Sequence, residues 1–258
     1  MVHGWIAAAA ATLALSAATI EGTDLTDFLQ GTPGADQVLA KGGDDIVFGL
    51  GDDDRIDGGP GRDVLHGDGV CPPGTERPDV CTDDDDRTGG DDVLRGGDGD
   101  DVLLGGRGND LLDGEAGVDS LSADAGNDTV EAGDGDDEVD GGTGLDKIDG
   151  GTGDDWIATG PGSDRIEGGA GDDLIATETG NDRIDGGSGD DQIESGSGND
   201  RLTGGRGRDA INAGSGRDTI DVRDGERDTV NCGPGRDAAT VDSGDRVRNC
   251  ERVRRLQL

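Results

Sequence analysis

An aspartate recurs every nine residues along most of this chain, and this register constrains the fold more than any other feature. The series starts at Asp27 and, after a break between Asp63 and Asp92, continues in step to Asp218. In all 20 repeats an aliphatic residue follows two positions after the Asp. Gly occupies the fourth place of most repeats, counting the Asp as the sixth, and usually the first and second as well. Such a frame indicates a repeat architecture, in which each unit packs against its neighbours.

Each repeat divides into a turn and a minimal strand. The first six residues suit a tight turn, because Gly tolerates positive φ and close backbone approach. The last three, such as residues 156–158, are typical of a strand whose central aliphatic residue points inward. A strand this short cannot stand alone, so it must stack on neighbouring repeats.

A second period, of 18 residues, indicates that two repeats make one coil. The place after the Asp forms one basic column and one mixed column, and the fifth place forms one Asp column and one Asn column. The basic column is Lys147, Arg165, Arg183 and Arg201, and the first three have an acidic residue two positions along the strand, so cross-strand charge pairs are predicted there. We name the Asp edge after Asp100, Asp136, Asp154, Asp172 and Asp190, and the Asn edge after Asn109, Asn127, Asn181 and Asn199. The predicted fold class is all-β: a parallel β-roll, a β-helix-like solenoid with 18 residues per coil.

The charge of the chain implies that such a roll needs a cation. The formal net charge is −38 and only 29% of residues are hydrophobic, a combination that otherwise favours disorder. Each repeat orders nine residues but buries roughly one aliphatic side chain, and stacked carboxylates would repel one another. Ca²⁺ with six to eight oxygen ligands would offset both defects, and suits Gly-rich turns better than Mg²⁺ does. Folding would then be coupled to metal binding.

The repeats resemble a known family. GGAGDDLIA (168–176) and GGSGDDQIE (186–194) look like the RTX (repeats-in-toxin) nonapeptide, also called the hemolysin-type calcium-binding repeat. The resemblance covers about residues 22 to 221. It implies a parallel β-roll that binds multiple Ca²⁺ ions between successive turns, with the sixth-place Asp as the principal side-chain ligand and turn carbonyls completing each site.

The candidate metal ligands therefore occupy two places of the repeat. The sixth-place candidates are Asp36, Asp45, Asp54, Asp63, Asp92, Asp101, Asp110, Asp119, Asp128, Asp137, Asp146, Asp155, Asp164, Asp173, Asp182, Asp191, Asp200, Asp209 and Asp218. The fifth-place candidates are Asp100, Asp136, Asp154, Asp172 and Asp190. The Asn edge replaces several of its first two glycines, for example with Thr177-Glu178, whereas the Asp edge keeps pairs such as Gly168-Gly169. We therefore predict tighter sites on the Asp edge, around Asp137 to Asp191.

An apolar run, residues 5–20, precedes the first repeat. Its length suits the hydrophobic region of a signal peptide, and residues 16–18 offer small side chains for cleavage, so residues 1–18 are predicted to be a signal peptide. The run is too short and Ala-rich for a convincing membrane span. No Lys or Arg precedes it, so an N-terminal capping helix or anchor is the alternative. A secreted, extracellular protein is the resulting prediction, with cell-surface association as a variant.

The rest of the chain divides into β-roll repeats at 19–66 and 89–221, an insertion loop at 67–88 and a C-terminal capping segment at 222–258. The capping segment is rich in Arg, and a basic docking patch for a cell-surface polyanion is an alternative interpretation of it.

The four cysteines lie outside the repeats, two in the insertion loop and two in the capping segment. Their even number in a secreted chain suggests two local disulfides, Cys71–Cys81 and Cys232–Cys250. Zinc ligation is poorly supported, since no Cys-x-x-Cys occurs.

No catalytic motif accompanies the repeats. There is no Tyr, His occurs only at His3 and His66, and the repeats account for the abundant paired acids. We therefore predict that the protein is not an enzyme, and its acidity argues against nucleic acid as a partner. The function predicted is that of a secreted calcium-binding β-roll whose partners are calcium ions. The alternative is a calcium-stiffened cell-surface adhesive or structural protein, with a polysaccharide or other surface partner that the sequence does not identify.

Overall fold

The computed structural model describes residues 4–7, 17–68 and 89–256, and every regular element in this part of the chain is a β-strand. The chain divides into two compact units, Met1–Asp134 and Gly135–Leu258. Most of the expected signal peptide and of the insertion loop, including Cys71 and Cys81, lies outside the described residues.

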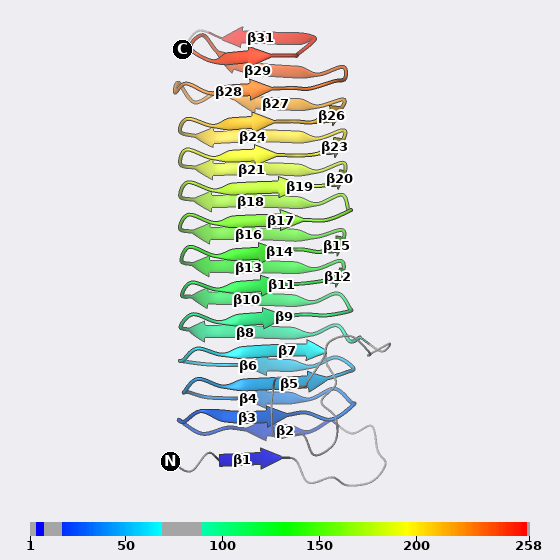
Figure 1. Ribbon diagram of the computed structural model, residues 1–258, viewed down its shortest axis with the longest axis vertical. Coiled ribbons are helices and arrows are strands. Elements are labelled where there is room, and N and C mark those ends of the chain that lie inside the picture. Colours follow the sequence, from blue (N-terminus) through cyan, green and yellow to red (C-terminus); the bar gives the residue numbers. More distant parts are fainter. Residues whose placement is uncertain (1–3, 8–16, 69–88, 257–258) are drawn as a thin grey trace. The chain divides into compact units, whose positions relative to one another are not determined.

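The first unit contains two parallel sheets whose strands alternate along the chain, as Figure 1 shows. One sheet has the strand order β1 (Gly4–Ala7), β3 (Asp27–Gln30), β5 (Ile46–Leu50), β7 (Val64–Asp68), β9 (Val102–Leu104) and β11 (Ser120–Ser122). The other has the order β2 (Thr19–Glu21), β4 (Gln37–Leu39), β6 (Arg55–Asp57), β8 (Val93–Asp98), β10 (Leu111–Ala116) and β13 (Thr129–Asp134). The short β12 (Ala125–Gly126) lies in a turn.

The second unit repeats this plan. Its first sheet runs β14 (Glu138–Asp140), β17 (Trp156–Thr159), β19 (Leu174–Thr177), β22 (Gln192–Glu194), β25 (Ala210–Asn212), β28 (Thr229–Asn231) and β30 (Arg246–Arg248). Its second runs β16 (Lys147–Thr152), β18 (Arg165–Ala170), β21 (Arg183–Ser188), β24 (Arg201–Arg206), β27 (Thr219–Val222), β29 (Ala238–Asp242) and β31 (Arg252–Leu256). Two-residue strands occupy the turns of the Asn edge: β15 (Thr143–Gly144), β20 (Thr179–Gly180), β23 (Ser197–Gly198) and β26 (Ser215–Gly216).

The strand register confirms the predicted coil of 18 residues. Ile157 of β17 pairs with Ile175 of β19, and Ile175 pairs with Ile193 of β22. These aliphatic residues stack in the interior and are at most 2% exposed. Because side chains alternate across a strand, the residues on either side of each aliphatic residue face outward. The fold is therefore the all-β parallel solenoid that the nine-residue register predicts.

The strand register is the same on both sides of residues 69–88, which lie outside the described residues. The backbone N–H of Asp63 donates to Asp101 Oδ1, 38 residues later. In regular coils the corresponding donor and acceptor are 18 residues apart, as for Asp101 and Asp119. Leu65 of β7 still pairs with Leu103 of β9, so the aliphatic stack continues across the insertion.

The predicted basic column forms, but the charge pairs expected beside it mostly do not. Arg165 lies opposite Arg183, and neither makes an ion pair with a described residue. Both side chains extend into solvent, where screening makes an ion pair weak. A pair of the predicted kind occurs in the first unit, where Arg95 Nε lies 3.8 Å from Asp113 Oδ2 on the neighbouring strand.

The chain after Asp221 continues to coil. β28 and β30 extend one sheet, β29 and β31 extend the other, and β31 pairs with β29 from Arg252 to Leu256. A disulfide joins Cys232 and Cys250, whose Cα atoms are 5.1 Å apart, as the sequence predicts.

Candidate metal centre

The sixth-place aspartates lie at the start of each strand and point into the roll. Those in the predicted set are at most 4% exposed, as buried as the aliphatic residues that follow them. The Asp and the aliphatic residue are two positions apart, so both face the interior. Each coil thus buries one carboxylate at each of its two edges, and the structure places all 19 sixth-place candidates in this position.

One oxygen of each carboxylate links successive coils. The backbone N–H of Asp155 donates to Asp173 Oδ1 at 3.0 Å, and that of Asp173 donates to Asp191 Oδ1 at 3.0 Å. The Asn edge has the same ladder, for example from Asp164 to Asp182 Oδ1 at 2.9 Å. Each carboxylate therefore satisfies a main-chain donor that the strand pairing would leave without a partner.

The second oxygen, Oδ2, is buried and accepts no hydrogen bond in many repeats. This holds for the described Asp45, Asp54, Asp63, Asp92, Asp101, Asp110, Asp155, Asp173, Asp191, Asp209 and Asp218. A buried, unsatisfied carboxylate oxygen is unfavourable, so repetition of the same orphaned atom points to a missing cation or proton.

A main-chain carbonyl faces the same space as this orphaned oxygen. A Cβ placed on Gly168, in the first place of its repeat, would lie 2.5 Å from Asp173 Oδ2 and 2.5 Å from the carbonyl oxygen of Gly186. At Gly186 the corresponding distances are 2.4 Å to Asp191 Oδ2 and 2.5 Å to the Gly204 carbonyl oxygen. Glycine at the first place therefore leaves a narrow space in which a carboxylate and a carbonyl oxygen converge from successive coils.

Burial raises the pKa of these carboxyl groups. It raises the pKa of Asp155 and Asp191 to about 7 and that of Asp173 to about 6, although the backbone N–H of the preceding coil lowers each value. In the first unit, burial raises the pKa of Asp54 and Asp92 to about 8, and the charge of Asp68 adds to this effect. The interior thus disfavours the bare carboxylate and favours any state in which its charge is neutralised.

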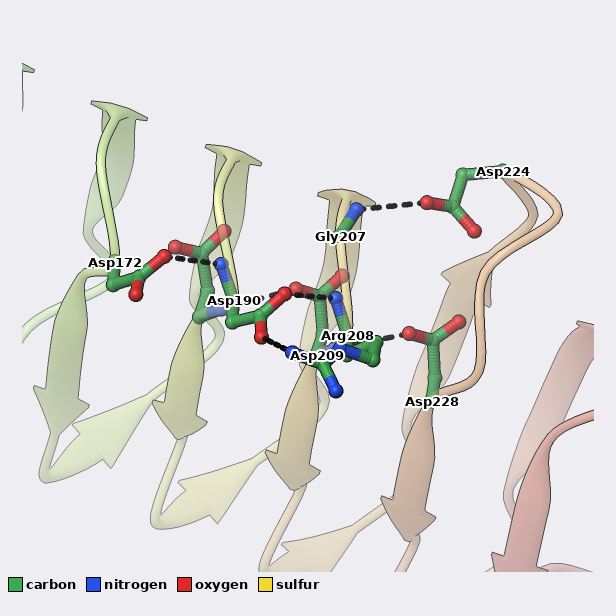
Figure 2. Close-up of polar contacts among 8 residues, drawn as sticks. Asp172, Asp190, Gly207, Arg208, Asp209, Asp224 and Asp228 are labelled. Carbon is green, nitrogen blue, oxygen red and sulfur yellow. Dashed lines mark hydrogen bonds and ion pairs between the residues drawn. The ribbon is translucent and has the colours of Figure 1, made fainter.

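The fifth-place aspartates lie on the outer surface of the Asp edge. The backbone N–H of Asp172 donates to Asp154 Oδ1 at 2.8 Å, and that of Asp190 donates to Asp172 Oδ1 at 2.7 Å. This outer ladder runs in the opposite direction to the inner one, since each acceptor here belongs to the earlier coil. Figure 2 shows Asp172 and Asp190 on the outside, with Asp190 also paired to the Arg208 guanidinium, and Asp209 and Asp228 in the inner ladder. The structure therefore does not bring the fifth-place and sixth-place carboxylates together.

Side chains alone do not build a metal site in the described residues. No group of three or more His, Cys, Asp or Glu side chains is arranged there to hold an ion. A hard cation in these turns would need main-chain carbonyls as well, and carbonyl oxygens are ligands that Ca²⁺ accepts. The orphaned Oδ2 atoms and the converging carbonyl oxygens supply this chemistry, so the residues present fit Ca²⁺.

The family comparison agrees with this geometry. The model of the RTX calcium-binding nonapeptide repeat (4 copies) matches residues 21–56, 39–69, 86–121, 113–148, 122–157, 149–184, 159–193, 167–202 and 194–226. These matches cover more than half of the chain. The chain belongs to the RTX calcium-binding nonapeptide repeat family. RTX nonapeptide repeats bind calcium in general. Comparison with curated proteins finds no matching relative.

Besides Asp27, whose Oδ2 accepts from the Thr23 backbone N–H and hydroxyl, two further RTX repeats depart from the pattern of orphaned oxygens. The Thr177 hydroxyl, in the first place of its repeat, donates to Asp182 Oδ2 at 2.8 Å. The Thr32 backbone N–H and hydroxyl both contact the Asp36 carboxylate, the hydroxyl at 3.1 Å from Oδ1. At these positions the protein itself supplies the partner that Oδ2 lacks elsewhere.

The RTX carboxylate ladder continues beyond the last residue that the sequence register reaches. Asp209 N–H donates to Asp228 Oδ1 at 2.9 Å, and Asp218 N–H donates to Asp237 Oδ1 at 2.9 Å. Glu251 takes over this role in the last coil, accepting the Asp237 N–H at 2.8 Å. One extra residue between Asp218 and Asp228 hides the continuation, although Asp228 and Val230 retain the Asp-x-aliphatic spacing.

Two other aspartates, the buried Asp68 and the half-buried Asp224, support the irregular turns of the RTX roll. Asp68 Oδ2 accepts the Arg107 backbone N–H at 2.9 Å, next to the point where the insertion loop departs. Asp224 Oδ2 accepts the Gly207 N–H at 2.8 Å, as Figure 2 shows, where regular coils use a main-chain carbonyl. These residues lie outside the nine-residue pattern, so the sequence carried no signal for them.

Proposed function

We propose that this protein is a secreted calcium-binding β-roll that holds several Ca²⁺ ions between successive turns, with folding coupled to calcium. The observation that carries the proposal is the column of buried Oδ2 atoms without hydrogen-bond partners, which in repeats such as those of Asp173 and Asp191 face the same space as a main-chain carbonyl of the next coil. A bound Ca²⁺ would supply the positive charge that these oxygens lack. Membership of the RTX family supports calcium as the ion.

The proposed coupling follows from what the carboxylates do in the folded chain. Asp173 Oδ1 holds the preceding coil through the Asp155 N–H, which fixes the carboxylate so that Oδ2 remains inside. In the unfolded chain the same carboxylate is hydrated and distant from its neighbours. Folding without a counter-ion would therefore bury many unneutralised charges at once, at a cost of several kcal/mol for each bare ion. At low calcium concentration we expect an extended, poorly ordered chain.

Secretion is the second part of the proposal. It rests on the apolar run of residues 5–20 and on extracellular calcium concentrations high enough to fill weak sites. None of the described residues forms a helix that could span a membrane. Amino-terminal sequencing of the protein recovered from the culture medium tests cleavage after residue 18. A chain that stays in the cell with residue 1 intact would contradict secretion.

Far-ultraviolet circular dichroism of the EDTA-treated chain tests the coupling to calcium. We expect a cooperative gain of β signal as Ca²⁺ is added, and no such gain with Mg²⁺ at the same concentration and ionic strength. A chain that is fully folded in EDTA would contradict coupled folding. Equilibrium dialysis with radioactive calcium then separates a folded roll that binds no calcium from one that binds it without needing it.

A further inference from the structure

The fifth-place columns of both edges change character toward the C-terminal end of the second unit. On the Asp edge the column continues from Asp190 into Arg208 and Arg227, and the Arg208 guanidinium pairs with Asp190. On the Asn edge the column ends in Arg217 and Arg236, and neither guanidinium makes a hydrogen bond or ion pair with a described residue. These two arginines share this lack of a partner with Arg165 and Arg183, but they lie at the turns of the roll and not on the face of a sheet.

These two arginines line a cavity with a third. The cavity measures about 400 Å³ and is lined by Arg217, Arg236, Glu251 and Arg252. The Arg252 side chain also lacks a partner among the described residues. The volume falls within the range of small-molecule sites.

The main chain holds all three arginines in place while their side chains remain available. Arg217 N–H donates to Asn199 Oδ1 at 3.2 Å, Arg236 N–H donates to the Gly216 carbonyl at 3.2 Å, and Arg252 N–H donates to the Asp237 carbonyl at 3.0 Å. Glu251 is the acid of the cavity, and its Oε2 already accepts the Asp237 N–H. The lining of the cavity therefore contains three arginines and one glutamate, and the glutamate carboxylate is engaged with the main chain.

We propose that this cavity binds a tetrahedral oxyanion, in the form of the phosphate or sulfate group of a sugar-sized molecule. Guanidinium groups recognise phosphate and sulfate oxygens through paired N–H donors. Three such groups offer more donors than the two oxygens of a carboxylate can accept, which favours the tetrahedral anion. The cavity has room for the group that carries the anion. The site goes beyond calcium binding, because its ligand is negatively charged and its residues belong to no calcium-binding position.

Isothermal titration calorimetry of the full chain in millimolar Ca²⁺ and low salt tests the site. Glucose 6-phosphate and inorganic sulfate are the two probes, and glucose is the uncharged control. Binding of glucose 6-phosphate alone would assign the site to an anion attached to a larger group. Binding of both probes would assign it to the oxyanion itself. Absence of binding by either probe would overturn the proposal.

Variants separate a specific site from general attraction to a basic end. Arg217→Gln and Arg236→Gln should each weaken binding about tenfold, because each removes charge-assisted hydrogen bonds. Arg208→Gln is the matched control, with the same charge change at the same place of a repeat on the other edge, and should leave binding unchanged. Equal losses in all three variants would overturn the proposal. The calcium-induced circular dichroism signal of each variant verifies that it folds, so failure to fold is distinguished from failure to bind.

Discussion

The same nine-residue motif takes two backbone conformations at the two edges of the second unit. On the Asp edge, β18 and β21 run on through their Gly-Gly pairs, so that Gly169 lies opposite Gly187 in the ladder. On the Asn edge the strands end earlier, and the turn passes through left-handed residues such as Gly196, with φ of 69°, and Gly214, with φ of 74°. Short separate ladders, β20 to β23 and β23 to β26, replace the continuous sheet there.

The first-place residue makes a chemical difference between the edges in the coil that contains Gly168 and Thr177. Elsewhere on the Asn edge, Asp110 and Asp218 also keep an Oδ2 atom without a hydrogen-bond partner. On the Asp edge it is Gly168 or Gly186, and the Oδ2 atom of the following Asp has no hydrogen-bond partner. On the Asn edge it is Thr177 in one coil, and its hydroxyl satisfies Asp182 Oδ2. A single side chain thus decides whether a buried carboxylate is completed by the protein or left for an ion. That the Asp edge holds the tighter sites stays a prediction, and this coil is the place to test it.

The largest expected effect is that of pH on the calcium-free roll. Burial raises the pKa of Asp155 and Asp191 to about 7, and that of Asp209 to about 6. An Asp in the unfolded chain titrates near a pH of about 3.9. The folded roll therefore binds protons more tightly than the unfolded chain does. In EDTA the free energy of unfolding should therefore be highest below a pH of about 4, should fall as the pH rises from about 4 to about 7, and should level off above that.

The far-ultraviolet circular dichroism signal of the EDTA-treated chain at several pH values measures this dependence: the calcium-free chain should be poorly ordered at neutral pH and should gain β signal as the pH falls toward about 4. With saturating Ca²⁺ the slope should shrink or reverse, because protons then compete with the ion for the same oxygens. Stability in EDTA that increases with pH would show that the buried carboxylates are stabilised as anions without a cation. The buried carboxylates would then need no counter-ion, and the two edges would have no reason to differ in calcium binding.

Neutralising one inner carboxylate on each edge tests the difference directly. Asp173→Asn should lower the stability of the calcium-loaded protein by about 1.5–3 kcal/mol, the range for a hydrogen bond or contact that involves a charged group. The same change in EDTA should be stabilising, because an amide costs less to bury than a bare carboxylate. Asp182→Asn should have the smaller effect in calcium, since Asp182 Oδ2 is already bonded to Thr177. Equal calcium dependence in the two variants, measured by thermal unfolding, would mean that the edges bind alike.

Removing the competing hydroxyl should shift the Asn edge toward the behaviour of the Asp edge. Thr177→Ala deletes the hydrogen bond to Asp182 Oδ2 and should destabilise the calcium-free roll by about 1 kcal/mol. In calcium the loss should be smaller, because the freed oxygen becomes available as a ligand. Thr179→Ala, two residues along the same turn, is the control and should behave alike in both conditions. A larger loss in calcium than in EDTA would contradict this account.

The repeat register predicted the features that depend on periodicity alone. The aliphatic stack through Ile157 and Ile175 and the burial of the sixth-place Asp both follow from side-chain alternation in an 18-residue coil. The continuation through Asp228 and Asp237 was not predicted, because one extra residue changes the spacing while the hydrogen-bond ladder absorbs it. The position of Asp154 on the outer surface was not predicted either. Whether the fifth-place or the sixth-place side chain points into the roll depends on the dihedral angles of the turn, which the repeat spacing does not give.

The smallest expected effect distinguishes the outer ladder from the inner one. Asp154 and Asp155 are neighbours in sequence, but Asp154 is exposed and accepts the Asp172 N–H, whereas Asp155 is buried and its Oδ2 has no partner. Asp154→Asn should change stability by no more than about 0.5 kcal/mol, because it alters a solvated surface group. Asp155→Asn removes the same charge one residue away and should raise the calcium concentration needed for folding. If calcium titrations show equal shifts for both variants, the fifth-place carboxylates are ligands after all, and the turn must rearrange around the ion to bring them inside.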